Sequence, residues 1–166
     1  MIHHGGLAWQ GSLVFGVFGG IWFIKRKGLS ILKVLDLTAP YIALGQAIGR
    51  IGCFLNGCCY GKLSNVGIYY PVHQETLIPT QLYSSLGLFL IFLILKFYKK
   101  YSSRDGEVFV LYLIFALTFR FFIEFLRADH YEFLFGLSIY QLVCLSLFLI
   151  STYVYTLIKN KSRKSS

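Results

Sequence analysis

Charged residues are scarce in this chain, and acidic residues are the scarcest. Only seven of its 166 residues are Asp or Glu, and the four charged residue types together make up 14% of the sequence. An average soluble protein carries about 25% charged residues. The mean hydropathy is +0.63, and 18% of the residues are aromatic. A water-soluble protein of this size could not bury so much apolar surface in its core. The composition therefore excludes a soluble globular domain and predicts an integral membrane protein.

Several kinds of segment are also missing. No long linker, low-complexity tract or short-period repeat interrupts the apolar runs, so we expect one integral membrane domain over residues 1–166. The opening residues MIHHGG lack the basic stretch of a signal peptide, and the apolar run 6–24 is too long for a signal-peptide core. We therefore interpret this first run as a spanning helix.

Five apolar segments are long enough to cross the hydrocarbon core of a bilayer, which is about 30 Å thick. They are residues 6–25, 37–55, 82–99, 107–127 and 135–158, and a basic tail follows at 159–166. Only helices and closed barrels satisfy every backbone polar group in lipid. The sequence therefore predicts an all-α, polytopic transmembrane helix bundle with about five spanning helices.

The basic residues are concentrated beside these apolar segments. The three clusters are Lys25, Arg26, Lys27 and Lys33; Lys96, Lys99, Lys100 and Arg104; and Lys159, Lys161, Arg163 and Lys164. A formal net charge of +9 could suggest nucleic-acid binding, but clustered Lys and Arg next to spans are typical of cytoplasmic loops. We expect no nucleic-acid partner. We predict a multi-pass protein of the bacterial inner (plasma) membrane, with the C-terminus in the cytoplasm and the loop 56–81 outside.

Four charged residues approach the predicted external face from inside the spans. Arg50 lies in the second span, and Arg120, Glu124 and Arg127 share one face of the fourth. Taken alone, the fourth span could hold a structural ion pair with Arg127 snorkelling to the interface. Arg50 adds positive charge that one carboxylate cannot cancel, and guanidinium groups match phosphate oxygens well. We therefore expect a phosphate site for an anionic phospholipid in the outer leaflet.

Glycines next to Arg50 strengthen this expectation, since they let backbone N–H groups approach a headgroup closely. The run that contains them, DLTAPYIALGQAIGRIGCFLNGCCYG (36–61), resembles the signature of prolipoprotein diacylglyceryl transferases, Gly-Arg-x-Gly-Asn-Phe-x-Asn-Gly-Glu-x-x-Gly. Three further stretches agree in order with that family, and a fourth agrees weakly. They are GGLAWQGSLVFG (5–16), PTQLY (79–83) and RFFIEFLRAD (120–129), with GLSIYQ (136–141) the weaker one.

The resemblance implies a reaction. Members of that family move the diacylglyceryl group of phosphatidylglycerol onto the lipobox cysteine thiol of a prolipoprotein, which forms a thioether and releases glycerol phosphate. The implied partners are phosphatidylglycerol, a prolipoprotein lipobox segment and the lipid bilayer. Because the nucleophile belongs to the substrate, no catalytic cysteine is needed, and we expect no cofactor and no metal.

The same resemblance implies roles for individual residues. The catalytic candidates are Arg50 and Arg120, which match the family's arginines, and Glu124, which matches its carboxylate. Gln10 is the fourth, because it stands at the position of the family's histidine. Headgroup binding is implied for Arg50 and Arg120 together with Asn56, Gly57 and Gly61. Supporting roles are expected for Asp36, Cys53, Cys58, Gln81, Tyr83 and Arg127.

The sequence departs from the family pattern in several places. The family's important histidine aligns with Gln10 in the longer register, although HHGG would suggest His4, and a glutamine cannot take a proton near neutral pH. The signature's first asparagine is Cys53 and its glutamate is Cys58, and Ile78 stands where a histidine is common. Helices that precede residue 5 in the family, with a tyrosine, are expected to be missing.

These departures leave the proton acceptor open. Glu124, His4 and His73 are the candidates to replace the missing base, and we favour Glu124. Two other functions remain possible, namely a catalytically impaired relative that binds anionic phospholipid or lipoprotein, and a small anion transporter. The transporter is disfavoured because no inverted repeat relates the two halves of the chain.

Three cysteines, Cys53, Cys58 and Cys59, lie within seven residues near the external face, whereas Cys144 stands alone in the fifth span. The three could be small buried apolar residues, or Cys53 could form a disulfide with Cys58 or Cys59. Metal or redox chemistry is the third alternative, although the spacing Cys-x4-Cys-Cys is a weak zinc pattern. Cys144, in a lipid-facing run, is expected to be a packing residue. In the loop 64–80, which carries His73, we favour an aromatic interface belt over contact with an incoming prolipoprotein.

Overall fold

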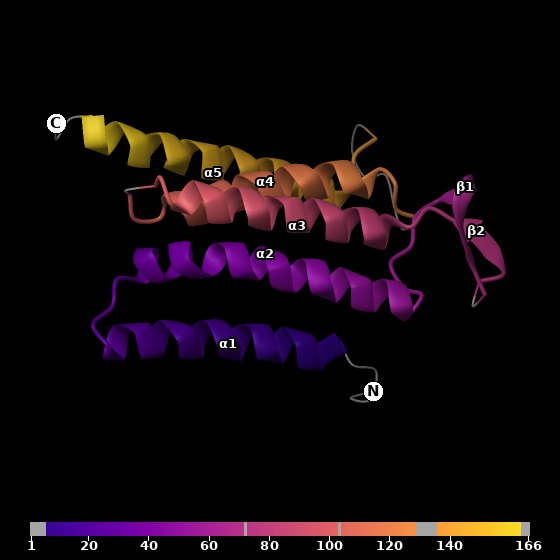
Figure 1. Ribbon diagram of the computed structural model, residues 1–166, viewed down its shortest axis with the longest axis horizontal. Helices are drawn as coiled ribbons and strands as arrows, with labels where there is room; N and C mark the ends of the chain where they lie inside the picture. Colours follow the sequence, from indigo (N-terminus) through magenta and orange to yellow (C-terminus); the bar gives the residue numbers. More distant parts are fainter. Residues whose placement is uncertain (1–5, 72, 103, 129–135, 164–166) are drawn as a thin grey trace.

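A helical bundle with a small hairpin at one end makes up the molecule. The computed structural model describes residues 6–71, 73–102, 104–128 and 136–163, with side chains from residue 15 to residue 160 of these ranges. The elements in chain order are α1 (Gly6–Arg26), α2 (Ile31–Leu55), β1 (Leu63–Tyr70), β2 (Glu75–Leu77), α3 (Thr80–Lys99), α4 (Glu107–Glu124) and α5 (Ile139–Arg163). The helices lie side by side along the long axis, and the hairpin extends beyond one end (Figure 1).

The predicted fold class is confirmed. Helices α2, α3 and α5 are each long and apolar enough to cross a membrane. The helix bounds differ from the predicted spans mainly at the ends, since α2 begins at Ile31 and α5 continues to Arg163. A search for apolar segments finds the part of a helix that suits hydrocarbon, and it misses the polar turns that extend beyond it.

The segment between α2 and α3 differs from the predicted loop, because it contains an antiparallel hairpin. Tyr70 pairs with Glu75 and Ile68 pairs with Leu77, and the register then shifts between Leu63 and Ile68. Gly67 is required here, since a Cβ at that position would collide with the backbone of Leu77. β-Branched and aromatic residues favour such strands, but no two-residue turn signal marked the hairpin in the sequence.

Small residues bring the central helices close together. Ala39, Ala43 and Ala47 form a buried stripe on α2 at a spacing of four residues, and the hydroxyl of Ser85 in α3 donates to the carbonyl of Ala47 at 2.9 Å. On α3, Gly87 leaves room for the ring of Phe119 from α4. Such small residues are typical of helix interfaces in membranes.

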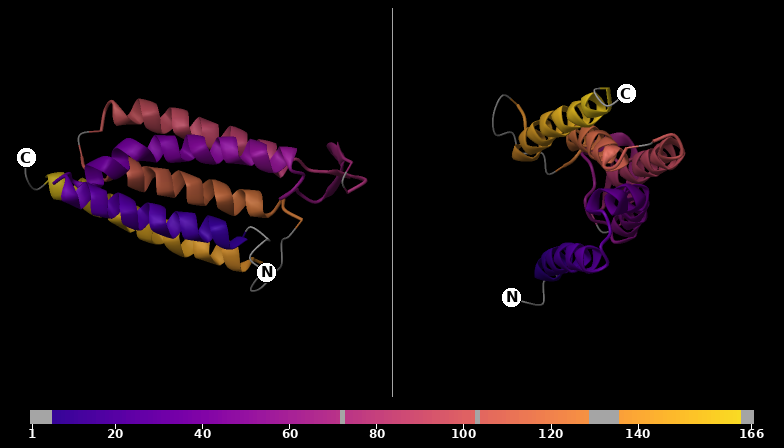
Figure 2. Two further views of the ribbon diagram at one scale, coloured as in Figure 1. Left: turned by 90° about the horizontal axis from the view of Figure 1, so that it is seen from below. Right: turned by 90° about the vertical axis from the view of Figure 1, so that its left-hand side faces the viewer.

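The remaining helices pack around this centre. Helix α5 packs along α4, whereas α1 contacts mainly α2 and lies at the edge of the bundle (Figure 2). The apolar core is formed by α2, α3 and α4, and its buried members are Ala39, Ala43, Ala47, Leu88, Ile91, Phe92, Leu95, Val108 and Tyr112.

The basic clusters gather at one end of the bundle. The last turn of α1 carries Lys25 and Arg26, and the last turn of α3 carries Lys96 and Lys99. Both turns, and the C-terminal end of α5, lie at the end opposite the hairpin (Figure 1). The two ends of the bundle therefore differ in charge, as the sequence predicts from the placement of its basic residues.

Candidate functional site

A cavity of about 550 Å³ opens between α2, α3 and α4. Its polar lining is Gln46, Arg50, Cys53, Ser84, Tyr112 and Arg120, and apolar residues form the rest of the wall. The volume lies within the range of about 300–1,000 Å³ that is usual for ligand sites. Arg50 lies near the end of α2 and Arg120 near the end of α4, so the cavity belongs to the hairpin half of the bundle (Figure 1).

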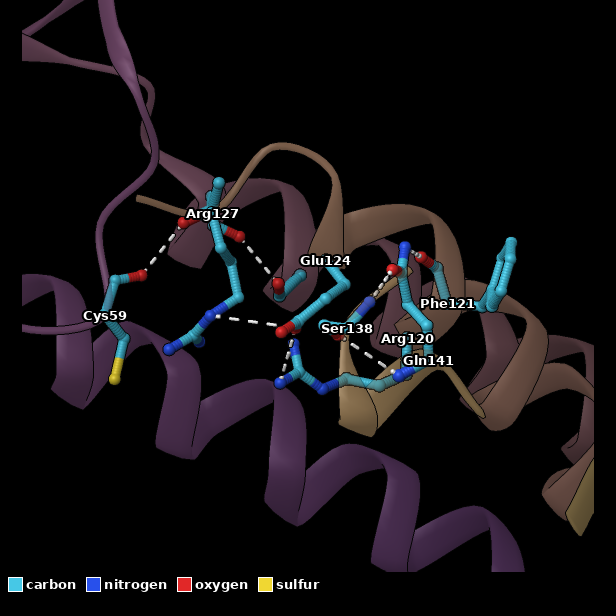
Figure 3. Close-up of polar contacts among 9 residues, drawn as sticks. Cys59, Arg120, Phe121, Glu124, Arg127, Ser138 and Gln141 are labelled. Atoms are coloured by element: carbon cyan, nitrogen blue, oxygen red, sulfur yellow. Dashed lines mark hydrogen bonds and ion pairs between the residues drawn. The ribbon is translucent and has the colours of Figure 1, made fainter. Parts of the chain in front are cut away.

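Arg120 is held by a buried carboxylate. Its Nη2 lies 2.8 Å from Oε2 of Glu124, one helical turn later, and the Glu124 side chain is only 2% exposed. Nε of Arg127 lies 3.8 Å from the same oxygen. Figure 3 shows the Glu124 carboxylate between the two guanidinium groups. The predicted alternation of charge along one helix face is therefore present as a pair of contacts.

Positive charge remains in excess around the cavity. Arg50 and Arg127 both act electrostatically on Arg120, and Arg50 comes from a different helix. The Glu124 carboxylate contacts Arg120 and Arg127, so it does not neutralise the additional charge of Arg50, and Arg120 keeps a third of its side chain exposed. An anion bound between Arg50 and Arg120 would offset this surplus, because guanidinium groups bind phosphate oxygens in charge-assisted hydrogen bonds.

Glu124 itself does not line the cavity. Its carboxylate is buried and faces Arg120 and Arg127. This geometry does not suit the expectation that Glu124 takes a proton from a thiol in the cavity, because a general base must reach the proton that it removes. The arrangement suits a residue that orients Arg120.

The end of α4 is tied to the segment that follows α2. Gly61 forms an antiparallel bridge with Arg127, and the amide of Lys62 donates to the carbonyl of Leu126 at 3.0 Å. A Cβ at Gly61 would lie 2.6 Å from that carbonyl oxygen and 2.8 Å from Thr80 Cγ2. Gly61 is therefore required for close packing and is not among the residues that line the cavity, so its headgroup role stays a prediction of the resemblance.

Asn56 and Gly57 also lie outside the cavity lining. Asn56 caps the C-terminal end of α2, and Gly57 takes the left-handed conformation that commonly follows a helix end, with φ of 65°. The Gly57 carbonyl lies 3.0 Å from Nε2 of His73, whose ring centroid is 4.3 Å from that of Tyr60. The structure therefore places these residues, and His73, in the packing between α2 and the hairpin.

Gln81 joins three parts of this end of the molecule. Its side chain is fully buried, its amide donates to the carbonyl of Cys58 at 2.7 Å, and its oxygen accepts from the hydroxyl of Tyr70 at 3.1 Å. Burial raises the pKa of the Tyr70 hydroxyl above its usual range. Gln81 thus links α3, the hairpin and the cysteine segment.

Asp36 and Tyr83, two further expected site residues, lie apart from the cavity. Asp36 is at the opposite end of the bundle, where it accepts from the amides of Gly106 at 2.6 Å and Phe109 at 2.8 Å. Tyr83 is 46% exposed and does not line the cavity. Gln10 lies in α1, but its side chain is outside the described residues, as is the whole of His4.

All four cysteines are free. Cys53 lines the cavity, and its sulfur lies within 4.8 Å of the sulfurs of Cys58 and Cys59, all three being partly exposed. The disulfide considered from the sequence is not formed in the structure. Cys144 is buried, as expected for a packing residue.

A family model described as prolipoprotein diacylglyceryl transferase matches residues 1–157. The chain belongs to this family. The relative from Clostridium tetani, named phosphatidylglycerol–prolipoprotein diacylglyceryl transferase, is 36% identical over 162 residues, which cover 92% of this chain and 64% of the relative. Relatives of the same name from Finegoldia magna and Campylobacter hominis are both 37% identical, and the match covers 66% and 57% of their lengths. The chain thus spans less than two thirds of the curated relatives that it matches here.

The sequence analysis did not identify three polar residues that line the cavity between α2, α3 and α4, namely Gln46, Ser84 and Tyr112. The hydroxyl of Tyr112 donates to Oε1 of Gln46 at 3.1 Å, and Ser84 lines the wall beside them. Gln46 gave a signal, because it is a polar residue inside a predicted span. Nothing in the sequence marked Tyr112 or Ser84, since both are common in membrane helices.

A further buried group lies behind Arg120. Gln141 of α5 is fully buried, its oxygen accepts from the amide of Ser138 at 2.8 Å, and its amide group donates to the carbonyl of Phe121 at 3.4 Å (Figure 3). These contacts fix the start of α5 against the turn of α4 that carries Arg120. Their only sequence signal was the weak agreement of 136–141 with the family.

Proposed function

We propose that this chain carries the transferase chemistry of its family, moving the diacylglyceryl group of phosphatidylglycerol to a lipobox cysteine thiol. The relatives from Clostridium tetani and Finegoldia magna are named phosphatidylglycerol–prolipoprotein diacylglyceryl transferases, which supports this proposal. One observation carries the proposal for this chain, namely that Arg50 and Arg120 line the same cavity from two different helices. The alternative of a lipid-binding relative without activity rests on the same cavity and is separated by experiment.

The two arginines would bind the phosphate of the lipid. In the reaction, a bond forms between the cysteine sulfur and the glyceryl carbon, and the bond between that carbon and its phosphate oxygen breaks. The electron pair of the broken bond leaves with glycerol phosphate. Guanidinium groups that already face this phosphate stabilise the charge that develops on the departing oxygen, and the apolar wall keeps water away from the reacting carbon.

The proton balance follows from the same products. The thiol loses one proton, which passes to the departing glycerol phosphate and on to water, because a phosphate monoester has a second pKa of about 6 and is mostly a dianion near neutral pH. Gln10 cannot serve as a base, since its amide does not take a proton near neutral pH. Glu124 is proposed as a positioning residue that holds Arg120 at 2.8 Å.

The proposed orientation places the cavity toward the outer leaflet of the bacterial plasma membrane. The basic turns of α1 and α3 lie at the other end of the bundle, and such clusters face the cytoplasm. The hairpin would then lie at the external surface and the C-terminus in the cytoplasm. A lipobox cysteine, which reaches the external side, could meet the lipid there.

The test is thioether formation on a lipobox peptide in proteoliposomes that contain the chain and phosphatidylglycerol. We expect transfer that falls by roughly 100-fold or more in Arg50→Ala and in Arg120→Ala, the size typical of losing a donor to a developing anion. Arg50→Lys and Arg120→Lys should recover little, because lysine lacks the planar fork. Arg104→Ala, at the opposite end of the bundle, is the matched control.

Two results would argue against this function. Transfer that is independent of both arginines would remove the proposed mechanism. Saturable binding of phosphatidylglycerol without transfer, abolished in the same two variants, would instead identify a relative that binds the lipid and does not react.

A further inference from the structure

We propose that Cys53, Cys58 and Cys59 form a binding site for a thiophilic divalent d10 ion such as Zn²⁺. The three sulfur atoms lie within 4.8 Å of one another, and each side chain is partly exposed. This inference does not depend on the proposed transferase function. It differs from the expectation drawn from the sequence, in which no metal was predicted.

The spacing of the sulfur atoms suits one ion. A zinc–sulfur bond is about 2.3 Å long, so three sulfurs around one zinc ion lie roughly 4 Å apart. Sulfurs already within 4.8 Å need only small rotations of their side chains to reach that distance. Three thiolates leave a fourth position of a tetrahedral ion for water, and partial exposure of the cysteines gives an ion access.

The backbone holds the three cysteines together. Cys53 lies near the end of α2, and the amide of Cys58 donates to its carbonyl at 3.1 Å. The carbonyl of Cys58 accepts from Gln81 at 2.7 Å, and that of Cys59 accepts from the hydroxyl of Thr80 at 2.9 Å. Gln81 and Thr80 are both buried. The cysteine segment is therefore anchored to the first turn of α3 independently of any sulfur contact.

The conformation of Cys59 explains why the sequence spacing gave so weak a signal. Its φ is 62°, a left-handed conformation that residues other than glycine, asparagine and aspartate rarely adopt. Consecutive side chains in an extended chain point to opposite sides. The left-handed residue breaks that alternation, and the sulfurs of the adjacent Cys58 and Cys59 come to the same side as Cys53.

The charge around the cluster also suits a bound ion. A divalent ion with three thiolates carries a net charge of −1. Cys53 lies three residues after Arg50, on the same helical face, and both line the arginine cavity. The negative complex would therefore stand beside the surplus positive charge of Arg50 and Arg120. Soft thiolate sulfur selects zinc-like and cuprous ions over magnesium or calcium.

The test uses the full chain, purified in detergent, reduced and freed of metal. Titration with Cd²⁺ should give sulfur-to-cadmium charge-transfer absorption that saturates at one ion per chain, and dialysis against Zn²⁺ should give the same ratio by metal analysis. Each of Cys53→Ser, Cys58→Ser and Cys59→Ser should weaken binding roughly 10-fold or more, as loss of a zinc-site contact does elsewhere. Cys144→Ser changes a buried cysteine of α5 that is not part of the cluster, and this variant should bind as the parent chain does.

A second measurement requires no variant and so does not depend on whether a substituted chain folds. In the parent chain, Zn²⁺ should protect Cys53, Cys58 and Cys59 from alkylation, as read by mass spectrometry of peptides, and leave the extent of Cys144 labelling unchanged. Several results would overturn the site: absence of saturable binding, binding spread over many weak sites, or unchanged binding in Cys53→Ser. A disulfide within the cluster that takes up no Cd²⁺ after reduction would overturn it as well.

Discussion

Glu124 shows how one buried residue can order a charged site. A carboxylate that is 2% exposed is stable only with partners, and here Arg120 and Arg127 approach the same oxygen. A buried ion pair of this kind adds little net stability, because desolvation of the charges offsets their attraction. What it contributes is position, since it fixes the Arg120 guanidinium at the cavity wall.

The first prediction concerns Glu124→Gln. We expect transferase activity to fall roughly 10-fold or more while the shape of the pH–rate profile is preserved, because the glutamine holds Arg120 less firmly. The free energy of unfolding in detergent should fall by less than the roughly 3–5 kcal/mol that is typical when a buried ion pair loses one partner, because Arg120 is partly exposed. Glu75→Gln, at the exposed first residue of strand β2, is the control.

Either of two outcomes would contradict the positioning role of Glu124. Full activity in Glu124→Gln would show that Arg120 does not need the ion pair. A rate that lost its pH dependence would show that Glu124 is the base after all.

The second prediction concerns the close approach at Gly61. A Cβ there would meet the Leu126 carbonyl oxygen at 2.6 Å, so Gly61→Ala should lower the free energy of unfolding by about 1–3 kcal/mol. Gly52 in α2 has no atom within 4 Å of the place that a Cβ would take, and Gly52→Ala should be neutral or stabilise the helix by up to about 1 kcal/mol. Chemical unfolding of both variants in detergent measures the difference, and equal effects would contradict the packing role.

At the scale of elements, helix ends are joined by side chains from other helices. Asp36 of α2 accepts hydrogen bonds from the amides of Gly106 and Phe109 at the start of α4. Those amides have no partner inside their own helix, and a negative charge at a helix N-terminus is favourable. Asp36 therefore fixes the position of α4 at the end opposite the cavity, and this sets how the Arg120 face meets α2.

The third prediction follows for Asp36→Asn. The side-chain NH₂ group of asparagine cannot accept from the Gly106 and Phe109 amides as both carboxylate oxygens do, so we expect a loss of about 1–3 kcal/mol in unfolding free energy. Asp105→Asn is a matched control, because Asp105 is 48% exposed and its contact with Lys33 is 3.8 Å long. Its effect should stay within about 0.5 kcal/mol. Equal losses in the two variants would remove the cross-helix role of Asp36.

At the scale of the whole molecule, the two ends of the bundle differ in chemistry. One end carries the basic turns of α1 and α3, and the other carries the hairpin, the cysteine segment and the arginine cavity (Figure 1). Since basic loops stay in the cytoplasm, this difference predicts the orientation in the membrane.

The fourth prediction tests that orientation in bacteria. Alkaline phosphatase fused after Asn65, in the hairpin, should be active, because it folds outside the cytoplasm. Green fluorescent protein fused after Ser166 should fluoresce, because it folds inside. A fusion of alkaline phosphatase after Lys100 is the control and should be inactive. The reverse pattern would place the cavity at the inner leaflet and contradict the proposed site.

Much of the helical architecture could be predicted, and parts of the site could not. Arg50, Arg120 and Glu124 were identifiable because charge inside an apolar span is costly and stands out. Gly61 and Asn56 were assigned to headgroup binding, yet neither lines the cavity, because a motif does not reveal which of its members reach a ligand. The hairpin was not predicted, because its register depends on the close approach of Gly67 to the backbone of Leu77. That contact joins two strands and cannot be read from either strand alone.

The sequence by itself determined that the chain spans a membrane as a helix bundle, which end is basic, and to which family it belongs. Hydropathy, clustered charge and ordered motifs are local properties, so they can be read along the chain. Only the tertiary structure decided that Arg50 and Arg120 share a cavity, that Glu124 lies behind them, and that three cysteine sulfurs meet. These contacts depend on how each helix is rotated about its own axis relative to its neighbours and on the left-handed conformation of Cys59. Neither can be read from the order of residues in a single segment.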